Sequence, residues 1–150
     1  MILGTGVDLA EVDRIRASIQ RFGSRFTGRV FTPGEIAYAE RKANRFERYA
    51  ARFAAKEAAM KAIGTGWKRG VTWRDFEVAN QPSGKPCLYL HGEAARIARE
   101  LGVRRISLSL THTAALGMAH VIVEDQRPRA IAHPADASPP ATCRSCGGSR

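Results

Sequence analysis

The sequence predicts an α+β fold, in which a small and mostly antiparallel sheet packs against one long helix and several shorter helices. The long helix is expected at about residues 46–63, a segment rich in alanine and in charged residues that favour helices. Segments of strand length lie mainly in the second half of the chain, separated by glycine and proline turns. The chain has 150 residues, 44% of them hydrophobic, which is enough to bury the core of one domain.

The first segment of the chain predicts a short buried strand followed by a helix. Residues 2–7 are mainly apolar, and their two glycines allow a neighbouring backbone to approach closely. Apolar residues then recur at helical spacing over residues 9–19. Asp8 lies between these two elements. Its carboxylate is therefore expected either at the end of the strand, free for chemistry, or as the N-cap of the helix.

The middle of the chain predicts a second helix start. Thr32 would be the N-cap, Pro33 the first helical residue and Glu35 the partner that completes a capping box. This helix is expected to end near Lys42, before the long helix. The remaining elements are expected as a strand at 72–79, a turn at 80–86, a strand at 87–91, a helix at 93–101, and paired strands at 105–111 and 118–123.

The composition changes to proline, alanine, serine and arginine from Arg127 onward. We therefore expect one folded domain at residues 1–126 and a disordered tail at residues 127–150. Cys143 and Cys146 have a spacing that suits zinc, but four ligands are needed and only His133 lies nearby. A zinc site within one chain is therefore not expected.

The chain carries a formal net charge of +10, which predicts an acidic partner. From Arg14 to Arg29 there are five arginines and no acidic residue. Nucleic acid, an anionic membrane surface or an acidic protein would all be attracted to this segment. A solvated basic helix face explains the same pattern. The absence of a basic, apolar leader and of a bilayer-length apolar segment predicts a cytoplasmic protein.

The predicted long helix carries Glu57 and Lys61, four residues apart and therefore on one side of the helix. It is followed by Gly64, Thr65 and Gly66, a glycine turn that ends the helix and allows an anion to approach the backbone. A carboxylate, an ammonium group and a glycine loop together suggest phosphate chemistry. A surface ion pair followed by an ordinary helix end is the simpler alternative.

Further polar residues suggest which phosphate chemistry this would be. Asp8 and Glu57 are well separated in sequence and would together hold one Mg²⁺, with water and phosphate oxygens completing its shell. Lys61 and Lys85, with His112 and backbone N–H groups, would then bind a pyrophosphate. Each residue alone has an ordinary structural explanation.

The order and the amino-acid sequences of these segments resemble those of the holo-acyl-carrier-protein synthase group of 4′-phosphopantetheinyl transferases over about residues 1–125. The matching motifs are Gly4-Thr-Gly-Val-Asp8, Phe31-Thr-Pro-Gly-Glu35, the helix at 52–61 with Gly64-Thr-Gly66, Gly84-Lys85-Pro86 and Ser109-Leu-Thr-His112. The resemblance implies a 4′-phosphopantetheinyl transferase-like fold. It also implies transfer of the 4′-phosphopantetheine arm of coenzyme A to a serine of an apo acyl carrier protein, with release of adenosine 3′,5′-bisphosphate, in fatty acid biosynthesis.

The resemblance also implies roles for single residues. Asp8 and Glu57 become the Mg²⁺ ligands, and Glu57, Lys61 and Asp8 the catalytic residues. Glu57 is the first choice for the base that activates the serine, directly or through a metal-bound water, while Asp8 or a water alone stays open. The implied coenzyme A contacts are Lys61, Gly64, Thr65, Gly66, Ser83, Gly84, Lys85, Thr111 and His112.

Acyl carrier proteins of this type are small and acidic, which gives the basic segment a partner. Arg14, Arg25 and Arg29 match family positions, and Arg21 is added from its charge alone. Ile15 and nearby apolar residues would form the centre of this contact. The family further implies a homotrimer, with each active site at a subunit interface.

A basic nucleic-acid-binding module is the main alternative, favoured by the sequence pI of about 10.4 and by Trp67 beside Lys68 and Arg69. The sequence contains no recognisable helix-turn-helix, RNA-recognition or zinc-finger pattern. This alternative also gives no reason for Asp8 and Glu57, which would repel phosphates in the absence of a metal.

Overall fold

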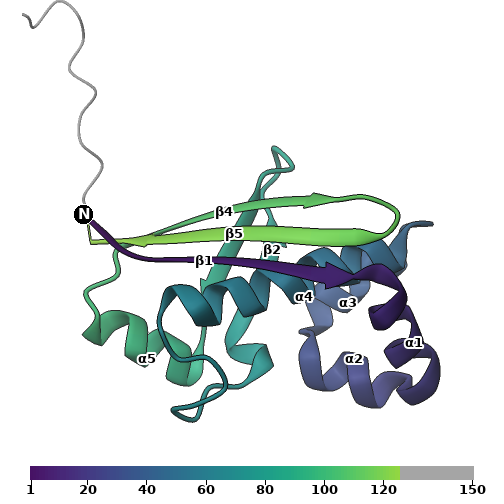
Figure 1. The fold of residues 1–150 in the computed structure, drawn as a ribbon, viewed down its shortest axis with the longest axis horizontal. Coiled ribbons are helices and arrows are strands. Elements are labelled where there is room, and N and C mark those ends of the chain that lie inside the picture. The colour runs from purple at the N-terminus through teal and green to yellow at the C-terminus, as the bar shows by residue number, and fades with distance from the viewer. Residues whose placement is uncertain (126–150) are drawn as a thin grey trace, which may run out of the picture.

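A computed structural model describes residues 1–125 of the chain. Its elements are β1 (Ile2–Glu11), α1 (Val12–Phe22), α2 (Ser24–Val30), α3 (Pro33–Glu40), α4 (Arg45–Ala62), the 3₁₀ turn η1 (Trp73–Asp75), β2 (Phe76–Asn80), β3 (Pro86–Leu90), α5 (Gly92–Glu100), β4 (Arg105–His112) and β5 (Leu116–Glu124) (Figure 1). The expected tail at 127–150, with Cys143 and Cys146, lies outside the described residues.

The strands form two antiparallel sheets. One has the order β1-β5-β4 and the other is the hairpin of β2 and β3. The long helix α4 lies across one face of the three-stranded sheet, with α1, α2 and α3 at one end and α5 at the other (Figure 1). This arrangement confirms the predicted α+β class. Within residues 1–125, no helix is long and apolar enough to cross a bilayer.

Glycines in the sheet let α4 lie almost directly on the strands. A Cβ atom at Gly4 would lie 2.0 Å from the carbonyl oxygen of Ala62, and one at Gly6 would lie 1.9 Å from that of Ala58. On β5, a Cβ atom at Gly117 would lie 2.5 Å from the α4 backbone. The side of α4 that faces the sheet is built mainly of alanines, which are buried. The distance between strand and helix is therefore set by backbone atoms.

Two boundaries differ from the sequence prediction. The strand β1 runs on to Glu11, so the prediction of a helix from residue 9 is wrong at its start, because Leu9 and Ala10 pair with β5. Asp8 therefore lies inside a strand and does not cap α1, whose N-cap is Glu11. The predicted strand at 72–79 begins only at Phe76.

The capping box at the start of α3 is confirmed, and it continues into a buried ion pair. The backbone N–H of Thr32 donates to Glu35 Oε2 at 2.8 Å, and the N–H of Val78 donates to Oε1 at 2.8 Å. Lys56 Nζ lies 2.8 Å from Glu35 Oε2, and neither side chain is exposed. Lys56 also donates to the carbonyl oxygens of Trp73 and Phe76. Helix α4 is thereby joined to α3, η1 and β2.

Candidate active site

Asp8, Glu57 and Lys61 come together where β1 crosses α4. The pairing of β1 with β5 holds the backbone of Asp8, and the four-residue spacing on α4 carries Glu57 and Lys61 to the same side. Lys61 Nζ lies 2.7 Å from Asp8 Oδ1 and donates to the carbonyl oxygen of Val7 at 3.0 Å. The Lys61 side chain is 50% exposed and that of Asp8 is 16% exposed, so solvent and ligands can reach this pair.

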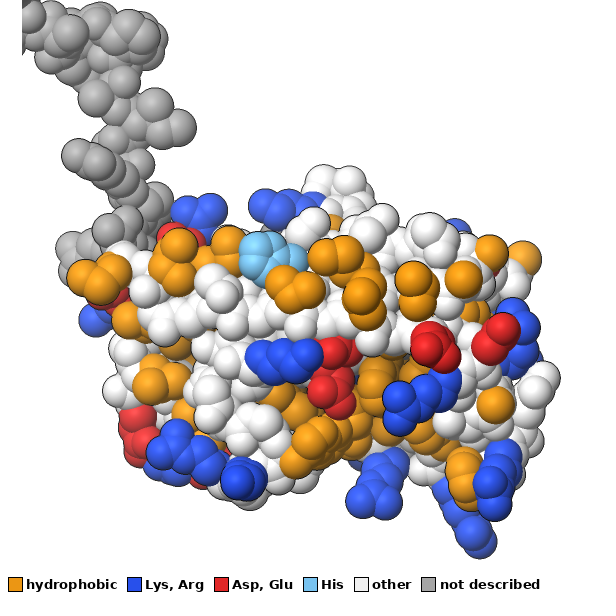
Figure 2. All heavy atoms as spheres, viewed as in Figure 1, with side chains coloured by type: hydrophobic (Ala, Val, Ile, Leu, Met, Phe, Trp, Pro, Cys, Tyr) orange, Lys and Arg blue, Asp and Glu red, His pale blue; other side chains and the backbone are white. Residues whose placement is uncertain are grey.

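A cavity of about 220 Å³ opens beside this pair. Asp8 and Glu57 line it together with Arg14 from α1, and Ile15 and Phe53 form its apolar wall. Figure 2 shows acidic and basic side chains gathered at the centre of this face, with a hydrophobic patch directly beside them. The cavity therefore offers carboxylates and cations next to an apolar surface.

The environment of Glu57 raises the pKa of its carboxyl group above the ordinary value. Burial is the main cause, and the nearby Asp8 carboxylate adds to it, while Lys61 and Arg14 oppose the shift. A raised pKa brings a carboxylate closer to the range in which it can accept a proton and release it again. Glu57 is therefore suited to act as a general base.

The donor set fits a magnesium ion. Asp8 and Glu57 are hard oxygen donors that line one cavity, where burial and then the nearby Asp8 carboxylate raise the pKa of Glu57, and a bound cation would oppose this shift. Within residues 1–125 there is no group of three or more metal-ligating side chains. Two carboxylates suit Mg²⁺, which commonly keeps waters and substrate phosphates as its other ligands.

The loop Gly64-Thr65-Gly66 forms a tight turn at the C-terminal end of α4. The N–H groups of Thr65 and Gly66 both donate to the carbonyl oxygen of Met60, and that of Gly64 donates to Lys61. The side chain of Thr65 is buried and bonds to the same Met60 oxygen. The loop N–H groups are thus already used within the chain, and Lys61 is the cation that this end of α4 offers to a phosphate.

A second group of polar residues surrounds His112, at the other edge of the sheet. His112 Nδ1 lies 3.3 Å from Glu47 Oε2, and a cavity of about 200 Å³ is lined by His112, Gly84, Arg48 and Arg52. The sequence analysis assigned no role to Arg48 or Arg52. Their four-residue spacing on α4, in step with Lys56, is the signal that marks a common helix face.

Arg52 has one donor with no partner. Its guanidinium lies 4.0 Å from the centre of the Tyr38 ring, and it donates to Asn80 Oδ1 at 2.8 Å. Its Nε is buried and has no hydrogen-bond partner among the described residues. Burial lowers the pKa of this guanidinium, with Tyr38 and Glu35 opposing the shift. A buried and incompletely paired arginine at a cavity suits an anionic ligand.

The two groups do not meet within one chain. Strands β1 and β4 lie on opposite sides of β5, which separates them by about 10 Å at the usual strand spacing. Arg52 and Lys61 are nine residues apart, about two and a half helical turns, and therefore lie on opposite sides of α4. Thr111 lies on the outer face of the sheet beside Met118, whereas its neighbour His112 lies on the α4 face.

The remaining predicted residues lie on exposed surfaces. Ser83 and Lys85 are exposed in the turn between β2 and β3. The four arginines predicted to contact a partner are exposed on α1 and α2, and none pairs with a carboxylate among residues 1–125; they are Arg14, Arg21, Arg25 and Arg29. Ile15 is only 3% exposed, so the large exposed apolar side chain of this surface is Phe22.

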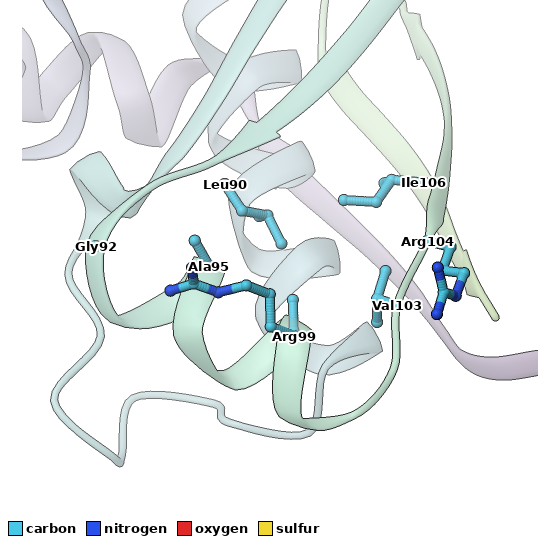
Figure 3. Close-up of a pocket in the computed structure, with 8 residues that line it drawn as sticks. Leu90, Gly92, Ala95, Arg99, Val103, Arg104 and Ile106 are labelled. Atoms are coloured by element: carbon cyan, nitrogen blue, oxygen red, sulfur yellow. The ribbon is translucent and has the colours of Figure 1, made fainter.

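A larger cavity lies away from these residues. It has a volume of about 430 Å³ and lies between α5 and β4, where Leu90, Ala95, Val103 and Ile106 point toward one space (Figure 3). Its lining includes arginines but no carboxylate or histidine. It therefore lacks the groups that acid–base or metal chemistry requires, and the smaller cavity at Glu57 is the candidate active site.

Known proteins resemble this chain in sequence and in fold. The family model described as the 4′-phosphopantetheinyl transferase superfamily matches residues 4–118. A holo-[acyl-carrier-protein] synthase of Solibacter usitatus is 74% identical over 125 residues, which are 83% of this chain and all of that protein. The crystal structure of the holo-[acyl-carrier-protein] synthase from Neisseria meningitidis aligns with a TM-score of 0.76 at 34% identity, covering 83% of this chain and 99% of that one.

A further solved structure was determined with a ligand. It is the Helicobacter pylori holo-[acyl-carrier-protein] synthase in complex with coenzyme A, which aligns with a TM-score of 0.71 at 27% identity and covers 80% of this chain and 99% of that one. The family match spans both β1, with Asp8, and α4, with Glu57 and Lys61. The chain belongs to the 4′-phosphopantetheinyl transferase superfamily.

Proposed function

We propose that this protein is a holo-[acyl-carrier-protein] synthase, which transfers the 4′-phosphopantetheine group of coenzyme A to a serine of an apo acyl carrier protein in fatty acid biosynthesis. The observation that carries the proposal is that Asp8 and Glu57 line one accessible cavity, with Lys61 paired to Asp8 beside it, in a chain of this family. Because the chain belongs to this family, we propose transferase activity in place of the nucleic-acid-binding alternative. The proposal includes a cytoplasmic location, where coenzyme A is made and used.

In the proposed reaction, the serine Oγ attacks the β-phosphorus of coenzyme A. A new bond forms between Oγ and phosphorus, while the bond from phosphorus to the bridging oxygen breaks and adenosine 3′,5′-bisphosphate leaves. Glu57 accepts the proton of the serine hydroxyl, a role that suits its raised pKa. Lys61 lies beside Asp8 and would balance the charge that develops on the leaving phosphate.

Asp8 and Glu57 would hold Mg²⁺ in this site. When bound, the ion supplies positive charge to the diphosphate and thereby favours departure of the leaving group. Asp8 now pairs with Lys61, and this pair is accessible enough to exchange one partner for another. Lys61 would then be free to turn toward a phosphate oxygen.

The group around His112 would bind the nucleotide end of coenzyme A. Arg48 and Arg52 supply cationic donors, one of them incompletely paired, and His112 lies at the same cavity. A phosphate accepts several hydrogen bonds at once and suits such a cluster. Gly84, with its exposed neighbours Ser83 and Lys85, would border this end of the ligand.

Because the two groups lie at opposite edges of the sheet and on opposite sides of α4, we propose that a complete site forms between copies of the chain in a homotrimer. The outer face of the three-stranded sheet supports this proposal, since it exposes large apolar residues that a second copy would cover. These residues are Leu3, Val7, Leu9, Leu116 and Met118, each 37–60% exposed. Sedimentation velocity would give the number of copies directly.

Mixing two inactive variants would test whether sites are shared between copies. Glu57→Gln removes the proposed base from one group, and Arg52→Met removes a cation from the other. If a site takes one group from each copy, mixed trimers will contain some intact sites and will regain part of the activity. A mixture that stays inactive, although the subunits are shown to exchange, would place both groups of a site in one chain.

Intact mass spectrometry tests the reaction itself. An apo acyl carrier protein incubated with this protein, coenzyme A and Mg²⁺ should gain the mass of one phosphopantetheine arm, and EDTA should prevent the gain. Glu57→Gln should reduce turnover far more than it weakens coenzyme A binding. Failure of the wild-type protein to modify any of several carrier proteins would overturn the proposed function.

A further inference from the structure

The cavity of about 430 Å³ between α5 and β4 arises from the order of the elements around it. Helix α5 connects β3 to β4, and these two strands lie side by side but belong to different sheets. The space between the sheets is therefore left to side chains. On α5 those side chains are the short ones of Ala95 and Ala98, which leave a hollow open above the strands (Figure 3). We refer to this cavity as the α5 hollow.

The lining of the α5 hollow is mainly apolar and is only partly covered. Leu90 at the end of β3, Val103 before β4 and Ile106 on β4 point into it (Figure 3). Each of the three packs against the core and keeps part of its surface exposed. An apolar cavity of this volume with a few charged groups at its edge has the properties of a small-molecule site. Since no acid–base group lines it, the hollow is suited to binding and not to catalysis.

Two arginines give the edge of the α5 hollow a positive charge. Arg99 on α5 and Arg104 before β4 both line it, and both are exposed. Neither forms an ion pair with a carboxylate among residues 1–125. In Figure 3 the two side chains lie on opposite sides of the hollow. An anion at this edge would therefore meet positive charge from α5 and from the sheet.

The carboxylates near these arginines are held by other cations. Glu93 and Glu100 on α5 both pair with Arg96, which leaves Arg99 without an acidic neighbour on its own helix. On the other side, Asp125 pairs with the N-terminal ammonium group. That ammonium group is the main cause of the lowered pKa of Asp125, and Arg104 makes a smaller contribution. The charge at the hollow is thus available to a ligand.

We infer that the α5 hollow binds a medium-chain fatty carboxylate, with the apolar chain between α5 and β4 and the carboxylate near Arg99 and Arg104. This site would be additional to the proposed transferase site. Strand β4 runs from Ile106 at the hollow to His112 at the other cavity, six residues or about 20 Å further along. A ligand in the hollow therefore leaves the proposed coenzyme A site free.

Methyl NMR of the full chain tests the location of the site, with octanoate as the probe. Octanoate should shift the methyl resonances of Leu90, Val103 and Ile106 in a saturable way, and saturating coenzyme A should leave these shifts in place. Octyltrimethylammonium has the same chain and a positive head group, so it should bind at least about fivefold more weakly. The absence of shifts at these methyl groups, or their loss on addition of coenzyme A, would overturn the inference.

Two sets of variants test the charge and the apolar space separately. The double variant Arg99→Gln with Arg104→Gln should weaken octanoate binding about fivefold, the magnitude expected when two solvated charge interactions are lost. Arg41→Gln is the matched control, since Arg41 is an exposed arginine outside the lining of the hollow and should not affect binding.

Ala95→Leu should fill part of the α5 hollow. The larger side chain would displace about two methylene groups of the ligand and weaken octanoate binding about tenfold. Circular dichroism checks that this variant is folded. Transfer to the carrier protein should continue at the wild-type rate, because Ala95 lies outside the Glu57 cavity. Unchanged octanoate affinity in both Ala95→Leu and the double arginine variant would overturn the inference, whereas absent transfer by the wild-type protein would overturn only the proposed function.

Discussion

Helix α4 carries two lysines, five residues apart, whose environments are opposite. Lys56 is fully buried and is surrounded by acceptors, namely the Glu35 carboxylate and the carbonyl oxygens of Trp73 and Phe76. Lys61 is half exposed and holds Asp8 at the edge of a cavity. Both ion pairs join a lysine to a carboxylate, at the similar distances of 2.8 Å and 2.7 Å, so their surroundings are what distinguish them.

This difference shows how one helix combines a fixed anchor with an exchangeable contact. Burial lowers the pKa of Lys56, and Glu35 opposes that shift, so the charged form of the ammonium group is stabilised by its carboxylate partner. Water cannot replace a lost partner there, which keeps the helix in one position. Lys61 can be solvated whenever Asp8 turns to another ligand. The exposed pair is therefore suited to binding, and the buried pair to positioning.

The largest expected effect comes from breaking the buried pair. Lys56→Met should lower the free energy of unfolding by about 3–5 kcal/mol, because it leaves the Glu35 carboxylate buried with no cation. Urea denaturation followed by circular dichroism measures this loss. The double variant Lys56→Met with Glu35→Gln should regain part of it. A loss below 1 kcal/mol in the single variant would contradict the anchoring role.

Breaking the exposed pair should have little effect on stability and a large effect on turnover. Lys61→Met should change the free energy of unfolding by no more than about 1 kcal/mol, since the pair is solvated. Turnover should fall by about 100-fold, the magnitude expected when one group that stabilises the leaving phosphate is removed. Denaturation and mass-spectrometric rates on the same preparation separate the two quantities. If stability and turnover fall together, Lys61 is an anchor as well.

A smaller effect is expected at the exposed arginines of α1 and α2 that pair with no carboxylate among residues 1–125. Arg25→Glu should raise the carrier-protein KM by about tenfold, with the coenzyme A KM nearly unchanged, because a negative charge would then face an acidic partner. Arg16→Glu is the control, since Arg16 already pairs with Asp13 at 2.7 Å. The contrast between the two variants should shrink in high salt. Equal effects on both substrates would argue against a docking role.

The smallest expected effect is on the titration of Glu57. Since Lys61 lowers and Asp8 raises the pKa of Glu57, Lys61→Met should shift this pKa upward and Asp8→Asn should shift it downward. Carbon-detected NMR of the Glu57 carboxyl group measures both shifts without catalysis. Lys68→Gln should leave this pKa in place, because Lys68 is exposed and does not contribute to it. Shifts of the opposite sign would mean that the groups are not arranged as described.

Much of the site could be predicted because it depends on local patterns. Glu57 and Lys61 share a helix face through spacing alone, and the capping box of Thr32 and Glu35 is a short-range signal. The burial of Glu35 and its pairing with Lys56 could not be predicted in this way. That pairing joins two residues that are 21 positions apart in the sequence, and its energy depends on a core that forms only in the folded chain.

The errors have equally specific causes. The backbone N–H and the hydroxyl of Thr72 donate to the Asp75 carboxylate, and the 3₁₀ turn closed in this way interrupts an alternating pattern that predicted a strand from Thr72. At Leu9, pairing with Met118 extends a strand into a segment with helical spacing. Both errors arise because tertiary contacts and capping outweigh a weak local preference.

The pairing of β1 with β5 has a consequence for the order of events during synthesis. β1 emerges first from the ribosome, but its strand partner among the described residues is β5, which ends at Glu124. Until that last strand is made, no hydrogen-bonded neighbour holds the backbone of Asp8 against α4. Such a contact between distant ends of a chain forms late. The candidate active site is therefore expected to form only after β5 has been made, and a chain interrupted before β5 is expected to lack activity.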